Sequence, residues 1–330
     1  MSRLPSVAEP LTEEEAEAAF GAMLDGTPSE EDIARFLSDL SDRGETPSEI
    51  AGAARAMRER LIPINAPANA IDVCGTGGDG HHTLNVSTAV ALVVAACGVP
   101  VAKHGNRAAS SKAGAADTLE ALGLDMAAAG RTAEKTLAEI GIAFLFAANH
   151  HPAMARIQPI RKALGKRTIF NLMGPLANPA GVERQLIGIA RPAYVPIYAE
   201  ALARLGTEHT LIVSGDEGLD ELSLAGGNEV ADVRGNDFAM KRIDASHVGL
   251  PQAPVSAIRG GDAAHNAAAL RALLLGEPGP YRNAVVFNAA AALMVGGAAD
   301  TWLEAAEEAA EAIDRGLAKA LLDCWIATAK

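Results

Sequence analysis

IDVCGTGGDG, residues 71–80, combines a short apolar run with glycines at positions 75, 77, 78 and 80. The run predicts a strand over residues 71–74 that ends in a tight turn, where glycine tolerates backbone conformations that other residues avoid. Such turns also expose backbone N–H groups that can cradle phosphate oxygens. A tight strand–helix connection without a ligand explains the glycines nearly as well. We expect a helix over residues 85–97 next, followed by a strand over residues 99–103.

The same alternation of strand and helix continues toward the C-terminus. Apolar runs predict strands over residues 143–146, 209–214 and 284–287, a helix over 115–122 and a helical segment over 300–330. Alternating strands and helices are typical of a parallel sheet covered by helices. Residues 69–330 are therefore predicted to form a large α/β domain with a mostly parallel central sheet flanked by helices.

The first 68 residues show three helical patterns, each opened by a capping signal at Thr12, Ser29 or Thr46. Prolines at positions 63 and 67 then mark a linker. We predict a small all-helical N-terminal domain over residues 1–68. Three helices are expected to leave apolar surface uncovered, which favours a homodimer through this domain. The apolar side chains concerned are Ile33, Phe36, Leu37, Leu40 and Met57.

Composition excludes several classes of protein. The chain has 330 residues, 28 basic and 41 acidic, and its net charge of −13 disfavours nucleic acid or an anionic membrane as a partner. Its longest apolar run, residues 89–102, is shorter than the ~18 residues of a membrane span. No apolar core of a secretory signal is found at the N-terminus. The isolated cysteines Cys74, Cys97 and Cys324 predict no disulfide framework and favour the cytoplasm.

Acidic residues are absent from two windows, residues 80–116 and 140–182. The cations in these windows are Lys103, Arg107, Lys112, Arg156, Arg161, Lys162, Lys166 and Arg167. Two long cationic segments in an acidic protein favour an anionic small-molecule ligand. The alternative is that buried helices and strands exclude acids, which accounts for residues 89–102 but not for the polar segment 103–112.

Polar residues follow both of the first two predicted strands. Asn85, Ser87 and Thr88, in the motif NVST, begin the helix after the glycine turn, where hydroxyl and N–H groups can hold a phosphate or a metal ion. Lys103 and Asn106, in KHGNR, end the next strand, at the sheet edge where ligands of open α/β sheets bind. Lysine suits phosphate neutralisation, and asparagine can orient a polar group.

Two further motifs carry charge. Arg161 lies in a predicted helix after NHHPAM and is suited to bidentate binding of a carboxylate, although a solvated helix face explains most cations there. Asp220 and Glu221, in GLDELS, are adjacent carboxylates, which together with substrate phosphates are usual Mg²⁺ ligands. Asp216 and Glu217 form a second acidic pair, so spacing alone does not choose between the two pairs.

The motifs GTGGDG, NVST, KHGNR, NHHPAM, RTIFNLMGPLANP and GLDELS follow one another in this order. Together they resemble the anthranilate phosphoribosyltransferase family over about residues 5–325. The resemblance implies transfer of the phosphoribosyl group of phosphoribosyl pyrophosphate (PRPP) to the amine of anthranilate, in tryptophan biosynthesis. It also implies a Mg²⁺-dependent homodimer, and a return of part of about 153–180 to the helical domain.

Matching positions carry the family's site residues onto this chain. The matches to PRPP contacts are Gly75, Gly78, Asp79, Thr83, Asn85, Ser87, Thr88 and Lys103. The matches to anthranilate contacts are Asn106 and Arg161, and those to metal ligands are Ser87, Asp220 and Glu221. The family commonly has serines where this chain has Ala113 and Ala115, so we expect backbone N–H groups around Gly114 to serve the phosphate instead.

No catalytic acid or base is assigned, because the proposed chemistry does not require a strong one. An aromatic amine is neutral at pH 7 and nucleophilic, so positioning and stabilisation of pyrophosphate suffice. A nucleoside phosphorylase, which carries Lys-x-Ser-Gly-Arg in place of KHGNR, is a disfavoured alternative. A nucleic-acid-binding paralogue is disfavoured by the net charge and the acidic pair. The roles of His104, His150 and His151 remain open, with a structural role favoured for His104.

Overall fold

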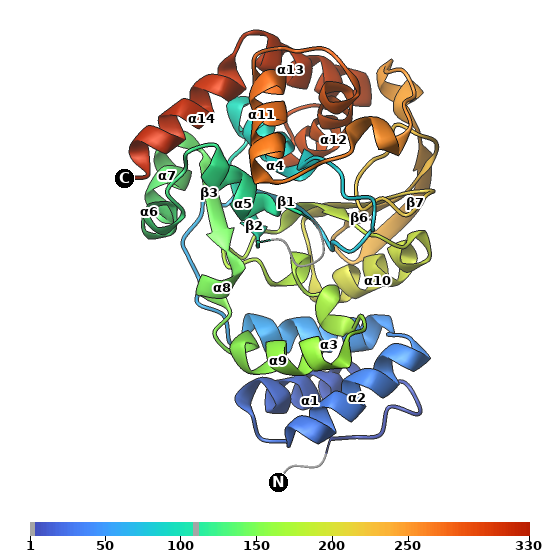
Figure 1. Ribbon diagram of the computed structural model, residues 1–330. Helices are drawn as coiled ribbons and strands as arrows, with labels where there is room; N and C mark the ends of the chain where they lie inside the picture. Colours follow the sequence, from blue (N-terminus) through green and yellow to red (C-terminus); the bar gives the residue numbers. More distant parts are fainter. Residues whose placement is uncertain (1–3, 108–111) are drawn as a thin grey trace.

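The computed structural model describes residues 4–107 and 112–330, arranged as a small helical part below a larger sheet-containing part (Figure 1). The smaller part contains α1 (Glu13–Asp25), α2 (Glu30–Arg43) and α3 (Pro47–Arg58). These helices begin where their capping signals predict, with side-chain caps from Thr12, Ser29 and Thr46. Residues 108–111, which belong to the polar segment of the first cationic window, lie outside the described part of the chain.

A seven-stranded sheet organises the larger part, in the order β3-β2-β1-β4-β5-β6-β7. The strands are β1 (Ile71–Gly75), β2 (Val101–Gly105), β3 (Ile142–Phe146), β4 (Arg184–Gly188), β5 (His209–Gly215), β6 (Asn228–Arg234) and β7 (Asp237–Ile243). Neighbours among β1–β5 pair in parallel, and β6 and β7 add antiparallel strands at one edge. The predicted fold class, a small helical domain plus an α/β domain with a mostly parallel sheet, is confirmed.

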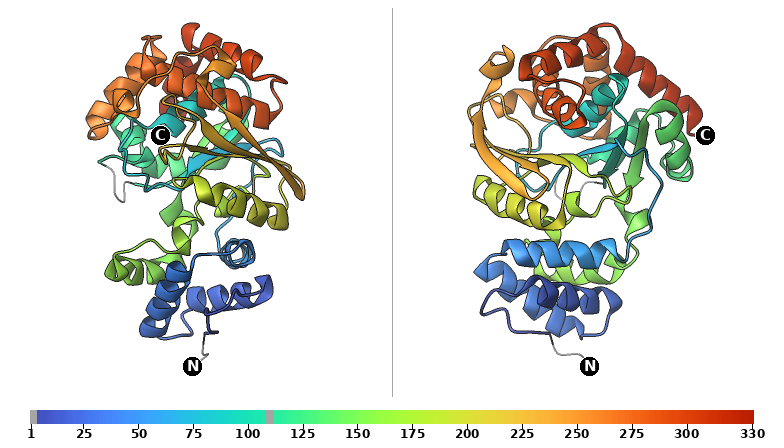
Figure 2. Two further views of the ribbon diagram at one scale, coloured as in Figure 1. Left: turned by 90° about the vertical axis from the view of Figure 1, so that its right-hand side faces the viewer. Right: turned by 180° about the vertical axis from the view of Figure 1, so that it is seen from behind.

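Helices cover both faces of this sheet, as the two further views show (Figure 2). One face packs against α4 (Val86–Ala96), α5 (Ala115–Ala121), α11 (Ala263–Leu274), α12 (Pro280–Gly296), α13 (Trp302–Asp314) and α14 (Leu317–Thr328). The other face packs against α10 (Val195–Leu205) and α7 (Ala133–Ile140). The short helices α6 (Met126–Arg131) and α8 (Ala147–His150) flank α7 and β3. Within the described ranges, no helix combines the length and apolarity needed to cross a membrane.

A fourth helix joins the N-terminal three from a distant part of the chain. This helix, α9 (Met154–Leu164), lies against α1 and α2, although it follows β3 in sequence (Figure 1). Its residues Ile157 and Ile160 share one core cluster with the N-terminal helices. The apolar side chains Ile33, Phe36, Leu37, Leu40 and Met57 are consequently all buried, at 6% exposure or less. The premise of the dimer prediction, that one chain leaves them uncovered, is therefore wrong.

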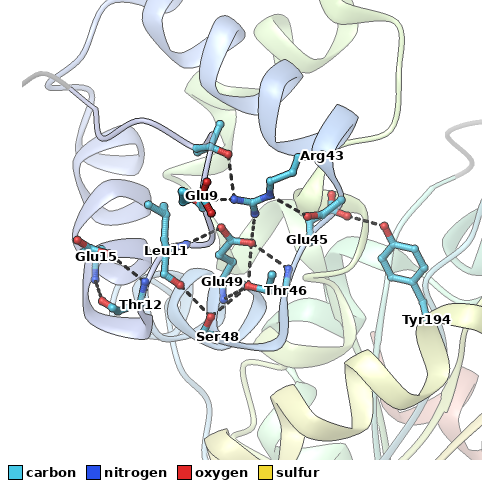
Figure 3. Close-up of polar contacts among 12 residues, drawn as sticks. Glu9, Leu11, Thr12, Glu15, Arg43, Glu45, Thr46, Ser48, Glu49 and Tyr194 are labelled. Atoms are coloured by element: carbon cyan, nitrogen blue, oxygen red, sulfur yellow. Dashed lines mark hydrogen bonds and ion pairs between the residues drawn. The ribbon is translucent and has the colours of Figure 1, made fainter.

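One buried carboxylate holds the helical part together (Figure 3). Glu49 is completely buried and accepts hydrogen bonds from the backbone N–H groups of Leu11 (3.0 Å) and Thr46 (2.9 Å). It also forms an ion pair with Arg43, at the C-terminal end of α2. A buried charge is tolerated when it is paired and hydrogen-bonded in this way. Glu49 thus joins the N-terminal segment, α2 and α3 at one point.

The expected strand over residues 284–287 is wrong, since these residues lie in the middle of α12. A short apolar run does not distinguish a buried strand from a segment of a buried helix. Eleven of the 17 residues of α12 are buried, so its sequence lacks the polar face that marks a surface helix. The strands β4, β6 and β7 were not predicted.

Candidate active site

The glycine turn after β1 receives a carboxylate from the loop after β5. Asp220 accepts a hydrogen bond from the Gly77 N–H at 2.7 Å. A Cβ atom at position 75 would lie 2.2 Å from Asp220 Oδ2, so Gly75 is needed for this close approach. Gly77 and Gly78 have φ angles of +69° and +76°, which side chains other than glycine rarely adopt. The turn is therefore shaped around the acidic loop as well as around a possible phosphate.

The neighbouring acid, Glu221, accepts a hydrogen bond at the start of α4. Glu221 Oε1 accepts a hydrogen bond from the Ser87 N–H at 3.0 Å, at the positive end of the helix. Its other oxygen, Oε2, is buried and has no hydrogen-bond partner among the described residues. Lys103, which is 3% exposed, donates to the Val73 carbonyl (2.7 Å) and the Ser87 hydroxyl (3.2 Å). We call Ser87, Lys103, Asp79, Asp220 and Glu221 the carboxylate site.

Three acids at this site disfavour one another's charge. Burial and the nearby charge of Asp79 raise the pKa of Asp220 to about 7. Burial and the charges of Asp220 and Asp79 raise the pKa of Glu221 well above its ordinary range. A divalent cation would relieve this repulsion and satisfy the unpaired Glu221 oxygen, so the residues fit Mg²⁺. Within the described residues, no group of three His, Cys, Asp or Glu side chains is arranged to hold a metal ion.

Lys103 and the next residue, His104, point to opposite faces of β2, as successive strand residues do. Lys103 reaches Ser87 on the α4 side of the sheet. His104 lies on the side of the helical part, where its Nδ1 is 2.9 Å from the Gly174 carbonyl. Asp72 of β1 fixes this arrangement, because it accepts hydrogen bonds from the His104 N–H (3.0 Å) and from Asn178 (2.8 Å). The end of β2 therefore serves two separate sites.

The second site is a cavity of about 240 Å³ between the helical part and the sheet. Its wall is mostly apolar, with a few polar groups. The lining residues include Met57 of α3, Met154 and Arg161 of α9, Asn106 after β2, and Phe170. The Arg161 guanidinium lies 5.9 Å from the centre of the Phe170 ring, and burial lowers its pKa. Among the described residues Arg161 has no acidic partner, so this interdomain cavity offers one free cation to an anionic ligand.

A histidine pair lines the same cavity. His104 Nε2 and His151 Nε2 are 3.3 Å apart, and both residues are buried. Since the Gly174 carbonyl can only accept, His104 Nδ1 carries the proton of the neutral ring and His104 Nε2 is left as an acceptor. Burial lowers the pKa of both histidines to about 4. The pair is therefore neutral at pH 7 and forms a fixed polar edge in an otherwise apolar cavity.

Other residues predicted for the phosphate site have internal partners. Asn85 Oδ1 accepts from Thr118 (2.6 Å) and Asn266 (2.8 Å), so this oxygen is already engaged. The Gly114 N–H, expected to serve a phosphate, donates instead to Asp117 at 2.9 Å. This N–H is therefore engaged by Asp117 at the start of α5, and a phosphate role for the other N–H groups around Gly114 stays a prediction.

Two threonines complete the predicted set. The Thr88 hydroxyl is buried and has no hydrogen-bond partner among the described residues, which leaves it available to a ligand in α4's first turn. Thr83 forms an isolated antiparallel bridge with Arg259, beside the glycine turn. Sequence reasoning gave no role to Asp72 or Asn178, whose bonding becomes visible only when β1 and residues 172–183 are brought together.

Several other charged residues near the site are already engaged by partners within the chain. Arg107 pairs with Asp117 and Glu120 at 2.8 Å and 2.9 Å, and is thus not a free cation. Of the second acidic pair, Asp216 pairs with the exposed Arg242 at 2.6 Å, and Glu217 bonds Ser223. Asp220 and Glu221, rather than these two, face Ser87 and the glycine turn. The geometry therefore favours Asp220 and Glu221 over Asp216 and Glu217 as the acids of this site.

This architecture is that of a glycosyl transferase. Residues 6–61 match the helical bundle domain of a glycosyl transferase family, and residues 67–319 match its α/β domain. An anthranilate phosphoribosyltransferase from Novosphingobium aromaticivorans is 75% identical over 327 residues, covering 99% of both chains. One from Erythrobacter litoralis is 73% identical over 326 residues, again covering 99% of both chains.

Solved structures agree. The anthranilate phosphoribosyltransferase of Thermus thermophilus has a TM-score of 0.93 and 44% identity, covering 98% of this chain and 97% of that one. The Saccharomyces cerevisiae enzyme in complex with PRPP and Mg has a TM-score of 0.88 and 28% identity, covering 99% and 96%. Its complex with 4-fluoroanthranilate has a TM-score of 0.86 and 26% identity, covering 99% and 95%. The chain belongs to the anthranilate phosphoribosyltransferase family.

Proposed function

We propose that this protein transfers the phosphoribosyl group of PRPP to the amine of anthranilate, giving N-(5-phosphoribosyl)anthranilate and pyrophosphate. The observation that carries the proposal is the pair of sites at the end of β2, with Lys103 on one side and the interdomain cavity on the other. One site suits a phosphorylated donor and the other suits a small aromatic acid. The yeast relative binds PRPP with Mg, and it also binds 4-fluoroanthranilate.

The carboxylate site is proposed to bind PRPP. Lys103, the N–H groups of the glycine turn and the Thr88 hydroxyl would contact its phosphates, and Asp220, Glu221 and Ser87 would hold Mg²⁺ together with pyrophosphate oxygens. Bound Mg²⁺ spreads the negative charge of the leaving pyrophosphate. Lys103 would exchange its hydrogen bond to the Val73 carbonyl for one to a phosphate, which is the stronger because both partners are charged.

The interdomain cavity is proposed to bind anthranilate. Arg161 would pair with the carboxylate, and the Phe170 and Met57 side chains would contact the aromatic ring. Asn106 and the neutral histidine pair would orient the amine toward the donor site. Because the amine is nucleophilic when neutral, these residues act by holding two substrates in register.

Anthranilate fluorescence tests this proposal directly. The signal should fall with time only when enzyme, PRPP and Mg²⁺ are all present, and pyrophosphate should appear in equal amount. Loss of fluorescence without PRPP would indicate mere quenching in the cavity. Phosphorolysis of a nucleoside, with no turnover of anthranilate, would contradict the proposal and favour the phosphorylase alternative.

Two broader properties belong to the same proposal. A homodimer rests on the family resemblance alone, since burial of the helical core within one chain removes the physical argument for it. Light scattering that gives twice the chain mass of 33.9 kDa would support the dimer, and a single-chain mass at micromolar concentration would refute it. Cytoplasmic location is supported by three cysteines that are all free thiols.

A further inference from the structure

A second, smaller cavity of about 220 Å³ lies between α2, the chain that leaves α9, and the segment that follows β4. We call it the hinge pocket. Its lining residues are Ser41, Glu45, Lys166, Arg167, Thr168, Leu172, Ile189, Arg191 and Tyr194. None of these was assigned a role above. Its volume is below the ~300 Å³ at which pockets for drug-sized ligands begin, and it leaves space for a small ion with its water.

Three of its lining residues are cations and one is an acid. Lys166 is partly neutralised, because it pairs with Asp42 at 2.8 Å. Within the described part of the chain, Arg167 and Arg191 form no ion pair with a carboxylate. Arg167 donates only to the carbonyls of Gly77 and Gly78, at 3.4 Å each. In a protein of charge −13, two unpaired guanidinium groups beside one cavity call for an anionic ligand.

Among the described residues, the acid in the pocket forms no ion pair with either arginine. Glu45 accepts a hydrogen bond from the Tyr194 hydroxyl at 2.7 Å, across the two parts of the molecule (Figure 3). Arg191 instead stacks over the Tyr194 ring, with 5.7 Å between guanidinium carbon and ring centre. Burial and the charge of Arg191 both lower the pKa of Arg167, although Asp220 and Glu45 oppose them. The two arginines repel each other where no described carboxylate bridges them.

An unpaired hydroxyl provides independent support. Thr168 lines the pocket and is 2% exposed, yet its Oγ1 has no hydrogen-bond partner among the described residues. A buried polar atom without a partner costs free energy unless a ligand or water satisfies it. A phosphate oxygen bound between Arg167 and Arg191 would accept a hydrogen bond from the Thr168 hydroxyl.

We propose that the hinge pocket is a second anion site, separate from the reaction site, which binds an inorganic phosphate-type oxyanion between Arg167, Arg191 and Thr168. Two sources supply such an ion: free phosphate, and the pyrophosphate that the reaction releases. Because Arg167 also touches the glycine turn, an anion bound here would tie the helical part to the donor site.

Isothermal titration calorimetry with Mg²⁺ present, but without PRPP or anthranilate, tests the site, with pyrophosphate and phosphate as separate titrants. The wild-type chain should bind two equivalents of pyrophosphate. Arg191→Gln should weaken one of them at least about tenfold, because a charged hydrogen bond is lost. Lys103→Ala should weaken only the other. Tighter binding of pyrophosphate than of phosphate to the hinge pocket would identify the reaction product as its occupant, and the reverse would identify free phosphate.

Controls separate this site from a general charge effect. Arg204→Gln removes the same charge from an exposed position on α10, where Arg204 pairs with Glu200, and should leave both equivalents intact. Thr168→Val keeps the side-chain volume and should weaken the hinge equivalent by about 2–10-fold without lowering the melting temperature of the free protein. This variant also serves if Arg191→Gln does not fold.

Two results would overturn the proposal: a single equivalent that Lys103→Ala alone removes, or equal losses in Arg204→Gln and Arg191→Gln. The titrations contain neither substrate, so they stand apart from the transferase assay, and failure of one does not imply failure of the other.

Discussion

The carboxylate site and the interdomain cavity are neighbours on one strand, but they differ in how full they are. The space among Gly75, Ser87, Asp220 and Glu221 amounts to about 10 Å³, room for about one water molecule, whereas the cavity around Arg161 measures about 240 Å³. In the carboxylate site, Lys103 and both acids bond to the chain itself. In the cavity, Arg161 has no acidic partner among residues 4–107 and 112–330.

This difference indicates that the two substrates meet different kinds of site. The cavity is already formed for an aromatic acid, and its histidine pair is held by backbone and by Asp72. The carboxylate site instead is closed by internal contacts, which PRPP and Mg²⁺ would have to replace if they bind there as proposed. Its acids repel one another until a cation arrives, so binding there is coupled to a local rearrangement.

The largest effect is expected from the acids. Asp220→Asn and Glu221→Gln should each raise the Mg²⁺ requirement and lower kcat by roughly 100-fold or more, because charge on the leaving pyrophosphate is then less well neutralised. Steady-state rates over a Mg²⁺ series measure both. Asp216→Asn is the matched control, since Asp216 pairs with Arg242 at the surface. Unchanged metal dependence in both variants would return the role to Asp216 and Glu217.

The two cations should separate the two substrates. Arg161→Ala is expected to raise the anthranilate KM at least about tenfold, because a buried charged hydrogen bond is lost, with little change in the PRPP KM. Lys103→Ala should show the opposite pattern. Both constants follow from initial rates with one substrate varied at a time. If both variants weaken the same substrate, the sites are one; if Arg161→Ala only lowers the melting temperature, the residue is structural.

A third prediction concerns the tight fit of the carboxylate site. Gly75→Ala places a Cβ 2.2 Å from Asp220 Oδ2, so it should lower the free energy of unfolding by about 1–3 kcal/mol and raise the Mg²⁺ requirement. Urea unfolding and metal titration measure these effects. Gly226 lies in the loop after β5 that also carries Asp220, and a Cβ there would meet no atom within 4 Å. Gly226→Ala should therefore change neither the stability nor the Mg²⁺ requirement. Equal effects of the two variants would show that Asp220 is not confined.

The smallest effect concerns pH and the cavity histidines. With a pKa of about 4 when folded, against 6.5 ordinarily, His104 and His151 bind protons more readily in the unfolded chain between these values. Their contribution to the free energy of unfolding therefore falls as the pH drops from 6.5 toward 4. The limit is about 1.4 kcal/mol per pH unit for each histidine. The buried acids Asp220 and Glu221 act in the opposite direction, so the informative quantity is a difference between variants.

Urea unfolding between pH 7.5 and 5 measures that difference. His104→Gln should lose less stability than the wild type over this range, whereas His265→Gln, at an exposed position, should follow the wild type. Identical pH profiles of wild type and His104→Gln would contradict a neutral, buried histidine pair.

Local signals in the sequence predicted the elements that local chemistry determines. Thr12, Ser29 and Thr46 cap their helices as expected, and the run before Gly75 forms β1. The strand expected over residues 284–287 failed because burial on all sides removes the periodicity that distinguishes helix from strand. The uncovered face expected on the N-terminal helices failed because α9 arrives from far along the chain to cover it.

The sequence predicted the region of the site better than the contacts within it. Motifs at strand ends bring Lys103, Ser87 and Asp220 together, which the rule for open α/β sheets anticipates. The partners of Asn85 lie on α5 and α11, and no local pattern reveals them, whereas the partner of the Gly114 N–H is Asp117, three residues further on. Sequence reasoning likewise counted Arg107 and Arg167 as equivalent cations, although Arg107 pairs with two acids and Arg167 pairs with none in the described part of the chain.

The alternation of Lys103 and His104 on β2 also bears on how such an enzyme can diversify. The interdomain cavity, proposed for the acceptor, is lined mostly by α3, α8, α9 and residues 170–174, whereas the carboxylate site, proposed for the donor, is formed by the sheet, the loop after β5 and α4. Mutations in the residues that line the interdomain cavity can therefore change which amine is accepted without changing the residues proposed to bind the phosphoribosyl donor. A single strand with two faces makes donor and acceptor preference separable traits, and new acceptors are best sought by varying Met57, Met154 and Phe170.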